Sequence, residues 1–251
     1  MAKANKKHSE LVKMFDSLSG TKGTWEVWND VVTMIAISIS NAFDNGERKE
    51  KRENYYLDIV KKYTSEEQRI IIKICVEITK AIESNPEQDL LGNLYMDLGF
   101  GSNALGQFFT PYSVCQAMAE TTFDKKYAQN LIENNGYIKV NEPACGAGAN
   151  IIAIANEMKK QGINYQNLAF FVAQDLSQLT ALMCYIQLSM LGCAAIIVIG
   201  DTLEKPFAFN TQTEIELSEK IWLTPMYYSD IWCIRRNAKL LDEFFIRKDK
   251  K

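Results

Sequence analysis

Apolar side chains recur at helical spacing through the first hundred residues of this chain. Residues 24–43, "TWEVWNDVVTMIAISISNAF", carry them on more than one face, as does a helix packed against others. Residues 65–84 also carry apolar side chains at helical spacing, and they end before an Asn-Pro pair that disfavours further helix. We therefore expect a helical segment over residues 1–100.

Local signals place the ends of these helices. Thr24 is the expected N-cap of the first, and Ser65 with Gln68 lies in capping-box register for the second. Between them, "GERKEKRE" (residues 46–53) alternates acidic and basic side chains. Such alternation favours a solvated face or a loop over a nucleic-acid patch.

After residue 100 the pattern changes to short apolar runs that alternate with helical segments. Strands are expected at 137–141, 168–174 and 194–200, with helices at 148–160 and 177–192 between them. A further helix should follow Thr110 as its cap and Pro111 as its first residue. Strands and helices in this order predict an α/β fold with a parallel, doubly wound sheet.

Composition narrows the possible chemistry. The formal net charge is -3, so the whole chain shows no global affinity for polyanions, although a local basic stripe would still permit nucleic-acid binding. Six cysteines without a CxxC pair and a single histidine, His8, argue against a zinc site and against histidine-based catalysis. The longest apolar stretch near the start, "VVTMIAISIS", is too short to span a bilayer, and "MAKANKKHSE" runs into no secretory h-region. We expect a cytoplasmic protein with reduced thiols, no metal and no membrane contact.

The stretch "NEPACGAGAN" (141–150) joins a predicted strand to a predicted helix. Gly146 and Gly148 permit a tight turn close to a ligand, and Glu142 adds a carboxylate at the strand end. The GxGxxG spacing and the Lys-Ser/Thr pair of phosphate loops are both missing. The turn therefore favours a nucleoside ligand without phosphates.

Acidic residues also follow the next two strands. Asp175 ends the second, at the position where a carboxylate typically accepts hydrogen bonds from ribose hydroxyls, and Asp201 follows the third. Because the carboxyl ends of parallel strands meet at one edge, Glu142, Asp175 and Asp201 should converge there. This constellation is more specific than either glycine alone.

The motifs "GQFFTP", "NEPACGAGAN", "AQDLS" and "GDTL", in this order, resemble the N-6 adenine DNA methylase family, and most closely the modification subunit of type I restriction systems. The resemblance implies a Rossmann-like methyltransferase domain over residues 101–251 after a helical N-terminal domain, and leaves open whether that domain is complete at its C-terminus. It implies S-adenosylmethionine as cofactor. It also implies DNA as partner, contacted directly or through another chain such as a specificity subunit.

Carried onto this sequence, the family's motifs assign the cofactor pocket. In the family, the equivalents of residues 107–111 and 142–148 surround the methionine part of S-adenosylmethionine. The residue that matches Asp175 holds the ribose hydroxyls, and the residue that matches Asp201 faces the adenine amine. The implied cofactor-binding residues are Gln107, Phe108, Phe109, Thr110, Pro111, Glu142, Pro143, Ala144, Cys145, Gly146, Gly148, Asp175, Leu176, Asp201 and Thr202.

The family's Asn/Asp-Pro-Pro-Tyr/Phe tetrapeptide, which holds the target base, is not found in the sequence. The nearest candidate is Thr224-Pro225-Met226-Tyr227, from which Thr224, Pro225 and Tyr227 are the expected target-base residues. Tyr227 and Tyr228, with Trp222 and Trp232 close by in sequence, fit an aromatic core cluster equally well. Both interpretations stay open at this point.

Two functional hypotheses follow. The first is an S-adenosylmethionine-dependent methyltransferase that acts on the adenine amine of DNA, or the cofactor-binding subunit of one in a restriction-modification-type system. The second is a catalytically silent S-adenosylmethionine-binding protein, regulatory or decoy, that acts through association. A nucleotide-dependent oxidoreductase is a weaker third, because the glycine spacing is wrong for one.

Overall fold

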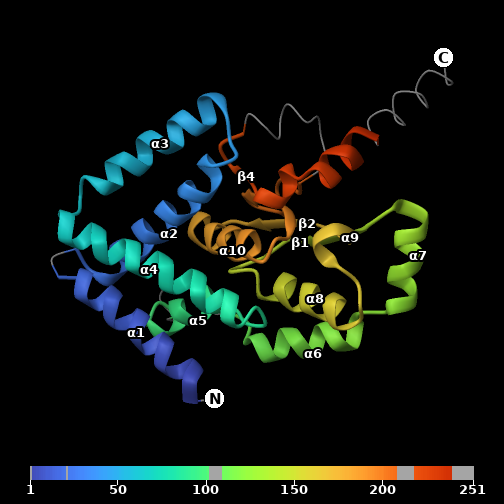
Figure 1. Ribbon diagram of the computed structural model, residues 1–251, viewed down its shortest axis with the longest axis horizontal. Helices are drawn as coiled ribbons and strands as arrows, with labels where there is room; N and C mark the ends of the chain where they lie inside the picture. Colours follow the sequence, from blue (N-terminus) through green and yellow to red (C-terminus); the bar gives the residue numbers. More distant parts are fainter. Residues whose placement is uncertain (1, 21, 102–108, 208–217, 239–251) are drawn as a thin grey trace.

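The computed structural model describes residues 2–20, 22–101, 109–207 and 218–238 of the 251-residue chain. Helices of the first hundred residues gather on one side of the molecule, and the sheet with its neighbouring helices forms the other (Figure 1). The helices before the first strand are α1 (Ala2–Leu18), α2 (Thr24–Asn41), α3 (Gly46–Val60), α4 (Ser65–Ser84), α5 (Leu90–Asp97), α6 (Tyr112–Thr122) and α7 (Lys125–Asn135).

The sheet confirms the predicted alternation of strands and helices. Its elements are β1 (Ile138–Glu142), α8 (Ala149–Lys160), α9 (Tyr165–Leu168), β2 (Ala169–Asp175), α10 (Gln178–Met190), β3 (Ala194–Ile199), β4 (Ile221–Leu223) and the 3₁₀ turn η1 (Pro225–Tyr228). Within the described residues the strand order is β1-β2-β3-β4. The first three strands are parallel, as predicted, while β4 pairs antiparallel with β3.

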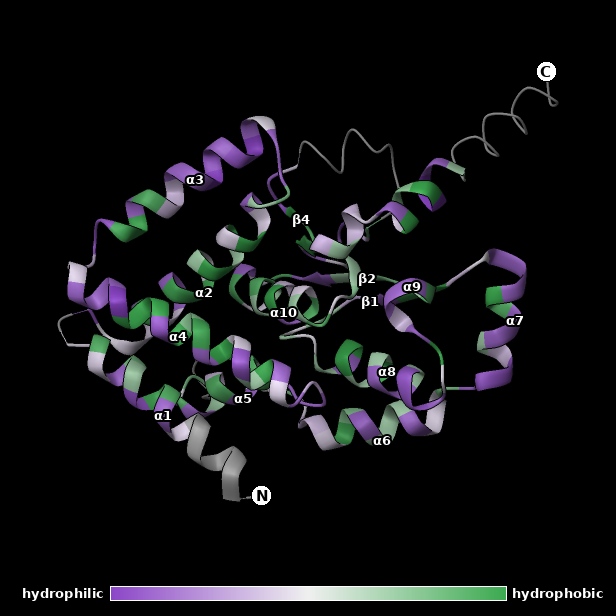
Figure 2. Cartoon of the chain, viewed as in Figure 1, coloured by the Kyte–Doolittle hydropathy of each residue, from purple (hydrophilic) through white to green (hydrophobic). Residues whose placement is uncertain are grey.

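The two faces of the sheet bury different partners. Phe171 and Ala173 point into the large core that contains α8, α10 and the N-terminal helices. Phe170 and Val172 alternate to the opposite face, where Tyr227 and Trp232 cover them. Residues of α10 and α2 are mostly hydrophobic and many of them are buried, whereas residues of α3 and α7 are mostly hydrophilic (Figure 2).

One continuous core joins the N-terminal helices to the sheet. Apolar residues of α2, α4 and α5 belong to the same buried cluster as β2, β3 and α10. The division into domains at residue 100 stays a prediction, and the packing shows that the two segments are in close contact along α10.

Several expected boundaries were wrong by one residue. The capping box of α4 is made by Thr64 and Glu67, because Thr64 Oγ1 accepts the Glu67 N–H at 3.3 Å and the Thr64 N–H reaches Glu67 Oε2 at 2.7 Å. Gly23 precedes α2 in place of Thr24 as N-cap, and Pro111 is the N-cap of α6 in place of Thr110.

The segment "GERKEKRE" is also not a loop or a wholly solvated face. It forms the first half of α3, and two of its arginines, Arg48 and Arg52, are buried. Asp44, just before the helix, lies between them and receives hydrogen bonds from both. The face of α3 with these arginines thus has a structural role that charge alternation alone does not reveal.

Candidate functional site

Residues 143–148, which contain Gly146 and Gly148 and are called the glycine turn below, connect β1 to α8 at the carboxyl end of the parallel strands. Gly146 has φ 50° and Gly148 has φ 100°, backbone conformations that residues with a Cβ rarely adopt. The Cys145 N–H donates to the Gln174 carbonyl at 2.9 Å, which attaches the turn to β2, and the Gly148 N–H closes it on the Cys145 carbonyl at 2.8 Å. The turn is therefore held closely against the sheet.

Glu142, the last residue of β1, has its carboxylate fixed from two directions. The Ala144 N–H donates to Oε1 at 3.2 Å, and Asn150 Nδ2 donates to Oε2 at 3.1 Å. Asn150 lies in the first turn of α8. The carboxylate is thus oriented by the same turn and helix that it borders.

Asp175, the last residue of β2, reaches across to the turn. Its Oδ2 accepts the Gly146 N–H at 2.8 Å, while Oδ1 accepts Thr180 Oγ1 and the Ser177 N–H, each at 2.9 Å. A carboxylate oxygen offers two lone pairs, so Oδ1 is saturated and Oδ2 retains one for a ligand. Asp175 therefore both tethers the turn and presents an acceptor.

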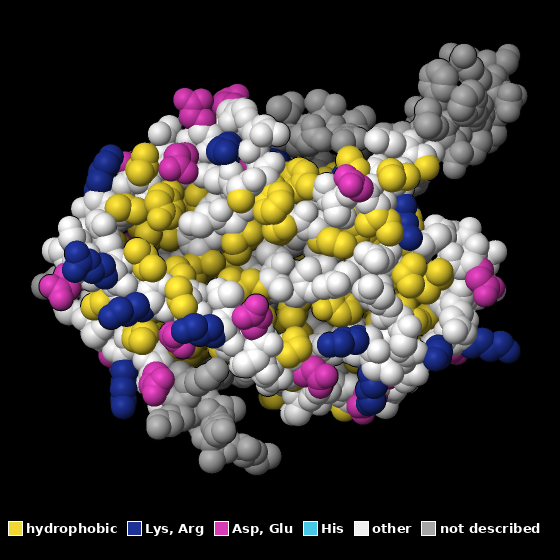
Figure 3. Space-filling view, in the orientation of Figure 1, with side chains coloured by type: hydrophobic (Ala, Val, Ile, Leu, Met, Phe, Trp, Pro, Cys, Tyr) yellow, Lys and Arg dark blue, Asp and Glu magenta, His cyan; other side chains and the backbone are white. Residues whose placement is uncertain are grey.

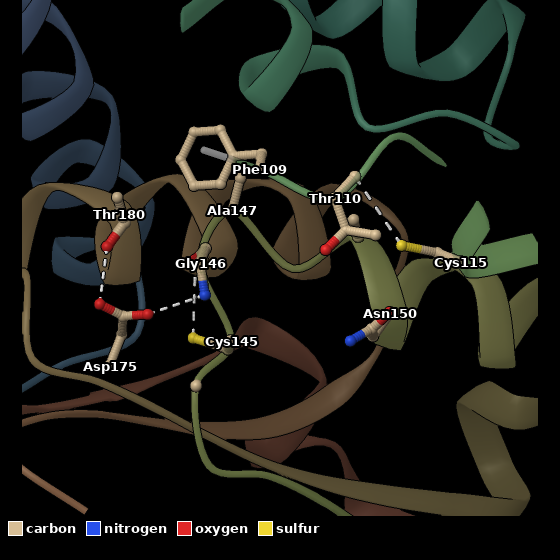
Figure 4. A pocket seen from close by; sticks show the side chains of 11 residues that line it. Phe109, Thr110, Cys115, Cys145, Gly146, Ala147, Asn150, Asp175 and Thr180 are labelled. Atoms are coloured by element: carbon tan, nitrogen blue, oxygen red, sulfur yellow. Dashed lines mark hydrogen bonds between the residues drawn. The ribbon is translucent and has the colours of Figure 1, made fainter. Parts of the chain in front are cut away.

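These groups surround a cavity of about 240 Å³ (Figure 4). Phe109 and Thr110 border it from the segment before α6, opposite Asp175 and Thr180 (Figure 4). Its lining residues are Phe109, Thr110, Cys115, Ala144, Cys145, Gly146, Ala147, Ala149, Asn150, Asp175 and Thr180. None of these lining residues carries a positive charge.

Six of the fifteen cofactor-binding residues expected from the sequence line this cavity. Phe109, Thr110, Ala144, Cys145, Gly146 and Asp175 line the cavity. Glu142 adjoins it through Asn150, and Pro111 and Gly148 are the N-caps of α6 and α8. Gln107 and Phe108 lie outside the described residues.

The remaining predicted residues extend the site along the strand ends. Thr202 Oγ1 donates to the Pro143 carbonyl at 2.6 Å, which ties the segment after β3 to the segment after β1. Asp201 Oδ1 accepts the Leu203 N–H at 2.8 Å, and Leu176 is 72% exposed. None of Leu176, Asp201 and Thr202 is among the lining residues of the cavity named above.

Sequence reasoning missed Asn150, Thr180 and Cys115. Asn150 stands in the quoted stretch itself, in the helical turn that follows the glycines, so its place was a usable signal. Thr180 is a polar residue in the first turn of a mostly apolar helix, three residues after the Ser177 cap. A buried polar side chain there needs a partner, and that partner is Asp175.

The candidate target-base residues lie at the opposite end of the sheet. Thr224 follows β4, and its Oγ1 accepts the Ala195 N–H at 2.9 Å and donates to the Cys193 carbonyl at 2.7 Å. Ala195 is near the start of β3, whereas Asp175 ends β2. Thr224 is 0% exposed and Tyr227 2% exposed, so in this arrangement they are packing residues, as the aromatic-core interpretation of Tyr227 proposed.

The thiols near the turn are not suited to nucleophilic chemistry. Burial raises the pKa of Cys115, and a hydrogen bond with Cys145 together with burial raises that of Cys184. Both thiols are therefore protonated near neutral pH, and it is the thiolate that acts as a nucleophile.

Two further findings concern the described residues. They contain no helix that is long and apolar enough to cross a membrane. Among these same residues, no group of three or more histidine, cysteine, aspartate or glutamate side chains is placed to hold a metal ion.

Comparison with known proteins gives the family. Residues 87–248 match the family model described as N-6 DNA Methylase. The Type II restriction enzyme and methyltransferase RM.BcgI of Heyndrickxia coagulans is 37% identical over 92 residues, which cover 35% of this chain and 13% of that protein. The chain thus corresponds to a small part of this relative's length. Because the family model spans more than half of the chain, including the glycine turn and Asp175, the chain belongs to the N-6 DNA methylase family.

Proposed function

We propose that the cavity at the ends of β1 and β2 binds S-adenosylmethionine for methyl transfer to the adenine amine of DNA. The observation that carries the proposal is Asp175, which holds the glycine turn through Gly146 and still presents an acceptor to a ligand. In an open α/β sheet this crevice is the usual ligand site.

The chemistry of the lining residues fits this cofactor. A sulfonium, an ammonium and ribose hydroxyls favour carboxylate neighbours, which Asp175 supplies in the lining and Glu142 supplies next to it, beyond Asn150. Ala149 and Asn150 bring the N-terminus of α8 to the cavity, and the positive end of this helix favours the carboxylate of the cofactor's amino-acid part. Phe109 offers a ring face to a cation. Phosphates, by contrast, would meet acidic side chains, and none of the described lining residues is a lysine or an arginine.

When bound, the cofactor supplies an activated methyl group on sulfur. The task of the chain is then positional, because in-line displacement needs the methyl carbon and the attacking nitrogen aligned at short distance. Asp175 would accept from the ribose, Glu142 would face the cationic part, and Phe109 with Thr110 would exclude water from one side.

Contact with DNA is expected to depend on a further chain. The strand ends carry Glu142, Asp175 and Asp201, whose charge repels phosphates. On the face in Figure 3, lysines and arginines lie interspersed with acidic side chains, without a concentrated basic patch. We infer that a specificity or partner subunit supplies the DNA contacts.

A second function is favoured by one specific observation. Thr224 and Tyr227 are buried at the end of the sheet opposite the cavity, so the described chain does not place them against a bound methyl group. A protein that binds the cofactor without transferring the methyl group, and acts through association, fits this geometry.

One experiment separates these functions. S-adenosylmethionine is titrated into the purified chain by calorimetry, and the same sample is incubated with tritiated cofactor and mixed duplex DNA. Binding with labelled DNA supports the methyltransferase, whereas binding without label supports the silent or partner-dependent protein. Absence of binding would overturn both.

Asp175→Ala should weaken S-adenosylmethionine binding by about 1–3 kcal/mol, roughly 5- to 150-fold, because the ribose acceptor and the tether on Gly146 are both lost. Calorimetric titration measures this change. Asp124→Ala is the matched control, since Asp124 also accepts a backbone N–H, from Tyr127 at 3.0 Å, but does so at the start of α7. An equal affinity in the two variants would contradict the assignment of Asp175.

A further inference from the structure

Three side chains of α10 face the glycine turn and its acidic partner. Thr180, Cys184 and Gln187 are spaced by four and three residues, which puts them on one side of the helix. Thr180 donates to Asp175, and a Cβ on Gly148 would lie 3.0 Å from Cys184 Sγ. Gln187 Nε2 donates to the Ala147 carbonyl at 2.8 Å. This face of α10 thus supports the turn, and its Thr180 also lines the cavity.

Of these three side chains, Gln187 makes the most hydrogen bonds to other elements. It is 1% exposed, and its amide makes hydrogen bonds in two directions. Besides the Ala147 carbonyl, Nε2 donates to Asp89 Oδ1 at 2.7 Å, and Oε1 accepts the Leu91 N–H at 3.1 Å. Both amide hydrogens and the oxygen are therefore used, as a buried amide requires.

The partner of Gln187 belongs to the N-terminal helices. Asp89 is 2% exposed and is the N-cap of α5, where its Oδ1 also accepts the Gly92 N–H at 2.9 Å. A Cβ at Gly92 would collide with the Asp89 carboxylate, so the glycine makes this close approach possible. A chain of buried hydrogen bonds therefore runs from the start of α5 through Gln187 to the Ala147 carbonyl.

The turn is consequently fixed on two sides. Asp175 holds the Gly146 N–H from the sheet, and Gln187 holds the carbonyl of the next residue from α10. Glycines make this turn possible, but they also leave it with many alternative conformations when it is not fixed. A binding turn that is ordered beforehand loses less conformational entropy when the ligand arrives.

We propose that Gln187 is a positioning residue for the cofactor site: with Asp89 it fixes the glycine turn in its binding conformation and links S-adenosylmethionine affinity to the start of α5. This inference rests on the proposed function of the cavity. It adds that the N-terminal helical segment takes part in cofactor binding although none of its side chains reaches the cavity lining described above.

The test compares Gln187→Met, which keeps the length of the side chain and removes its hydrogen bonds, with Gln68→Met. Gln68 makes a similar pair of bonds, from Nε2 to the Val60 and Tyr63 carbonyls at 3.2 and 2.9 Å, but within the N-terminal helices. Three quantities are measured on each full-length variant: S-adenosylmethionine affinity by calorimetry, urea unfolding, and hydrogen exchange of the peptide 143–150 without ligand.

Gln187→Met should weaken binding on the order of tenfold or more and speed exchange in the turn, because the Ala147 carbonyl is released. Gln68→Met should leave both unchanged while it lowers stability. Asp89→Asn should stay close to wild type, since an amide oxygen can accept both bonds. Burial already raises the pKa of Asp89, so its charge is not favoured at this position.

Asp89→Ser provides an independent variant if Gln187→Met does not fold. Serine retains an N-cap oxygen for α5 but is too short to reach Gln187. We therefore expect Asp89→Ser to lose less S-adenosylmethionine affinity than Gln187→Met, while hydrogen exchange in the turn still becomes faster than in wild type. Unchanged affinity and exchange in Gln187→Met, or equal changes in Gln68→Met, would overturn the proposal. If the wild-type chain binds no S-adenosylmethionine, the proposed function fails, and turn exchange still decides whether Gln187 fixes the turn.

Discussion

Asp44→Ala is expected to lower the free energy of unfolding by about 3–5 kcal/mol, because it leaves two buried guanidinium groups without the carboxylate between them. Arg52 Nη1 lies 2.6 Å from Asp44 Oδ2, and Arg48 Nε donates to the same oxygen at 3.1 Å. Ser40 and Tyr228 also donate to the carboxylate, at 2.6 and 2.7 Å. All three charged side chains are buried.

The cluster attaches the N-terminal helices to the last strand of the sheet. Arg52 stacks on Trp222, with its guanidinium carbon 3.5 Å from the ring centroid, and donates to the Ile221 carbonyl at 3.0 Å. Trp222 and Ile221 form β4, and Tyr228 ends η1. Loss of Asp44 should therefore destabilise the packing of β4 as well as the connection between α2 and α3.

Urea unfolding of wild type, Asp44→Ala and Asp58→Ala measures this effect. Asp58 pairs with Lys61 at 2.8 Å on the exposed surface of α3, where such a pair contributes about 0–1 kcal/mol. If Asp44→Ala costs no more than Asp58→Ala, the cluster does not stabilise the fold as its burial implies.

The contribution of Asp44 should also depend on pH. Burial alone would raise the pKa of Asp44, but hydrogen bonds from Arg48, Ser40 and Tyr228 outweigh burial and hold it below its ordinary value. A carboxyl with a depressed folded-state pKa stabilises above its unfolded pKa of about 3.9, and this part is lost as pH falls toward the folded value. The difference between wild type and Asp44→Asn should be constant from about pH 8 to 5 and shrink below about pH 4.

The sequence predicts the alternation of strands and helices well because the two kinds of segment differ clearly in their apolar pattern and length. Buried strands such as 169–175 are nearly continuous apolar runs, and the helices between them are long enough to be distinguished. Helix ends were less certain for a physical reason. Thr64 with Glu67 and Ser65 with Gln68 both satisfy the capping-box pattern, and only the backbone conformation decides between them.

Long-range pairing explains what the sequence could not show. Thr224 and Tyr227 resemble part of a target-base motif, but β4 joins the edge of β3 antiparallel and puts them at the far end of the strands. Charge alternation in α3 likewise hid the cluster that Arg48 and Arg52 form with Asp44, which precedes the helix. The spacing of four between these residues was a usable signal, but their distant partners are β4, which Arg52 reaches, and Tyr228 of η1.

The cofactor site was predictable where its residues are neighbours in sequence. Glu142, Gly146 and Gly148 share one turn, and Asp175 ends the adjacent strand. The supporting residues Thr180 and Gln187 were missed because they lie in a helix that is apolar overall. Polar side chains at helical spacing in such a helix must be satisfied internally, so their position already indicated a buried partner.

Gly148→Ala should reduce S-adenosylmethionine affinity by at least about tenfold and destabilise the fold by about 1–3 kcal/mol. At φ 100° a residue with a Cβ is strained, and the added atom would lie 3.0 Å from Cys184 Sγ and 3.5 Å from its Cα. Because Cys184 is fully buried on α10, the turn rather than the helix should move. That displacement would shift the adjoining Ala147 carbonyl away from Gln187 and disturb the first turn of α8.

Gly162→Ala separates backbone strain from this displacement. Gly162 has φ 81° but no atom within 4 Å of an added Cβ, and it follows α8 at the end away from the turn. It should cost about 1–2 kcal/mol of stability through its backbone alone and leave cofactor affinity unchanged. Calorimetric titration with parallel urea unfolding of both variants gives the comparison. If Gly148→Ala matches Gly162→Ala in stability and retains wild-type affinity, then close packing of the turn on α10 does not control cofactor binding, and the cavity must tolerate more than one conformation of the turn.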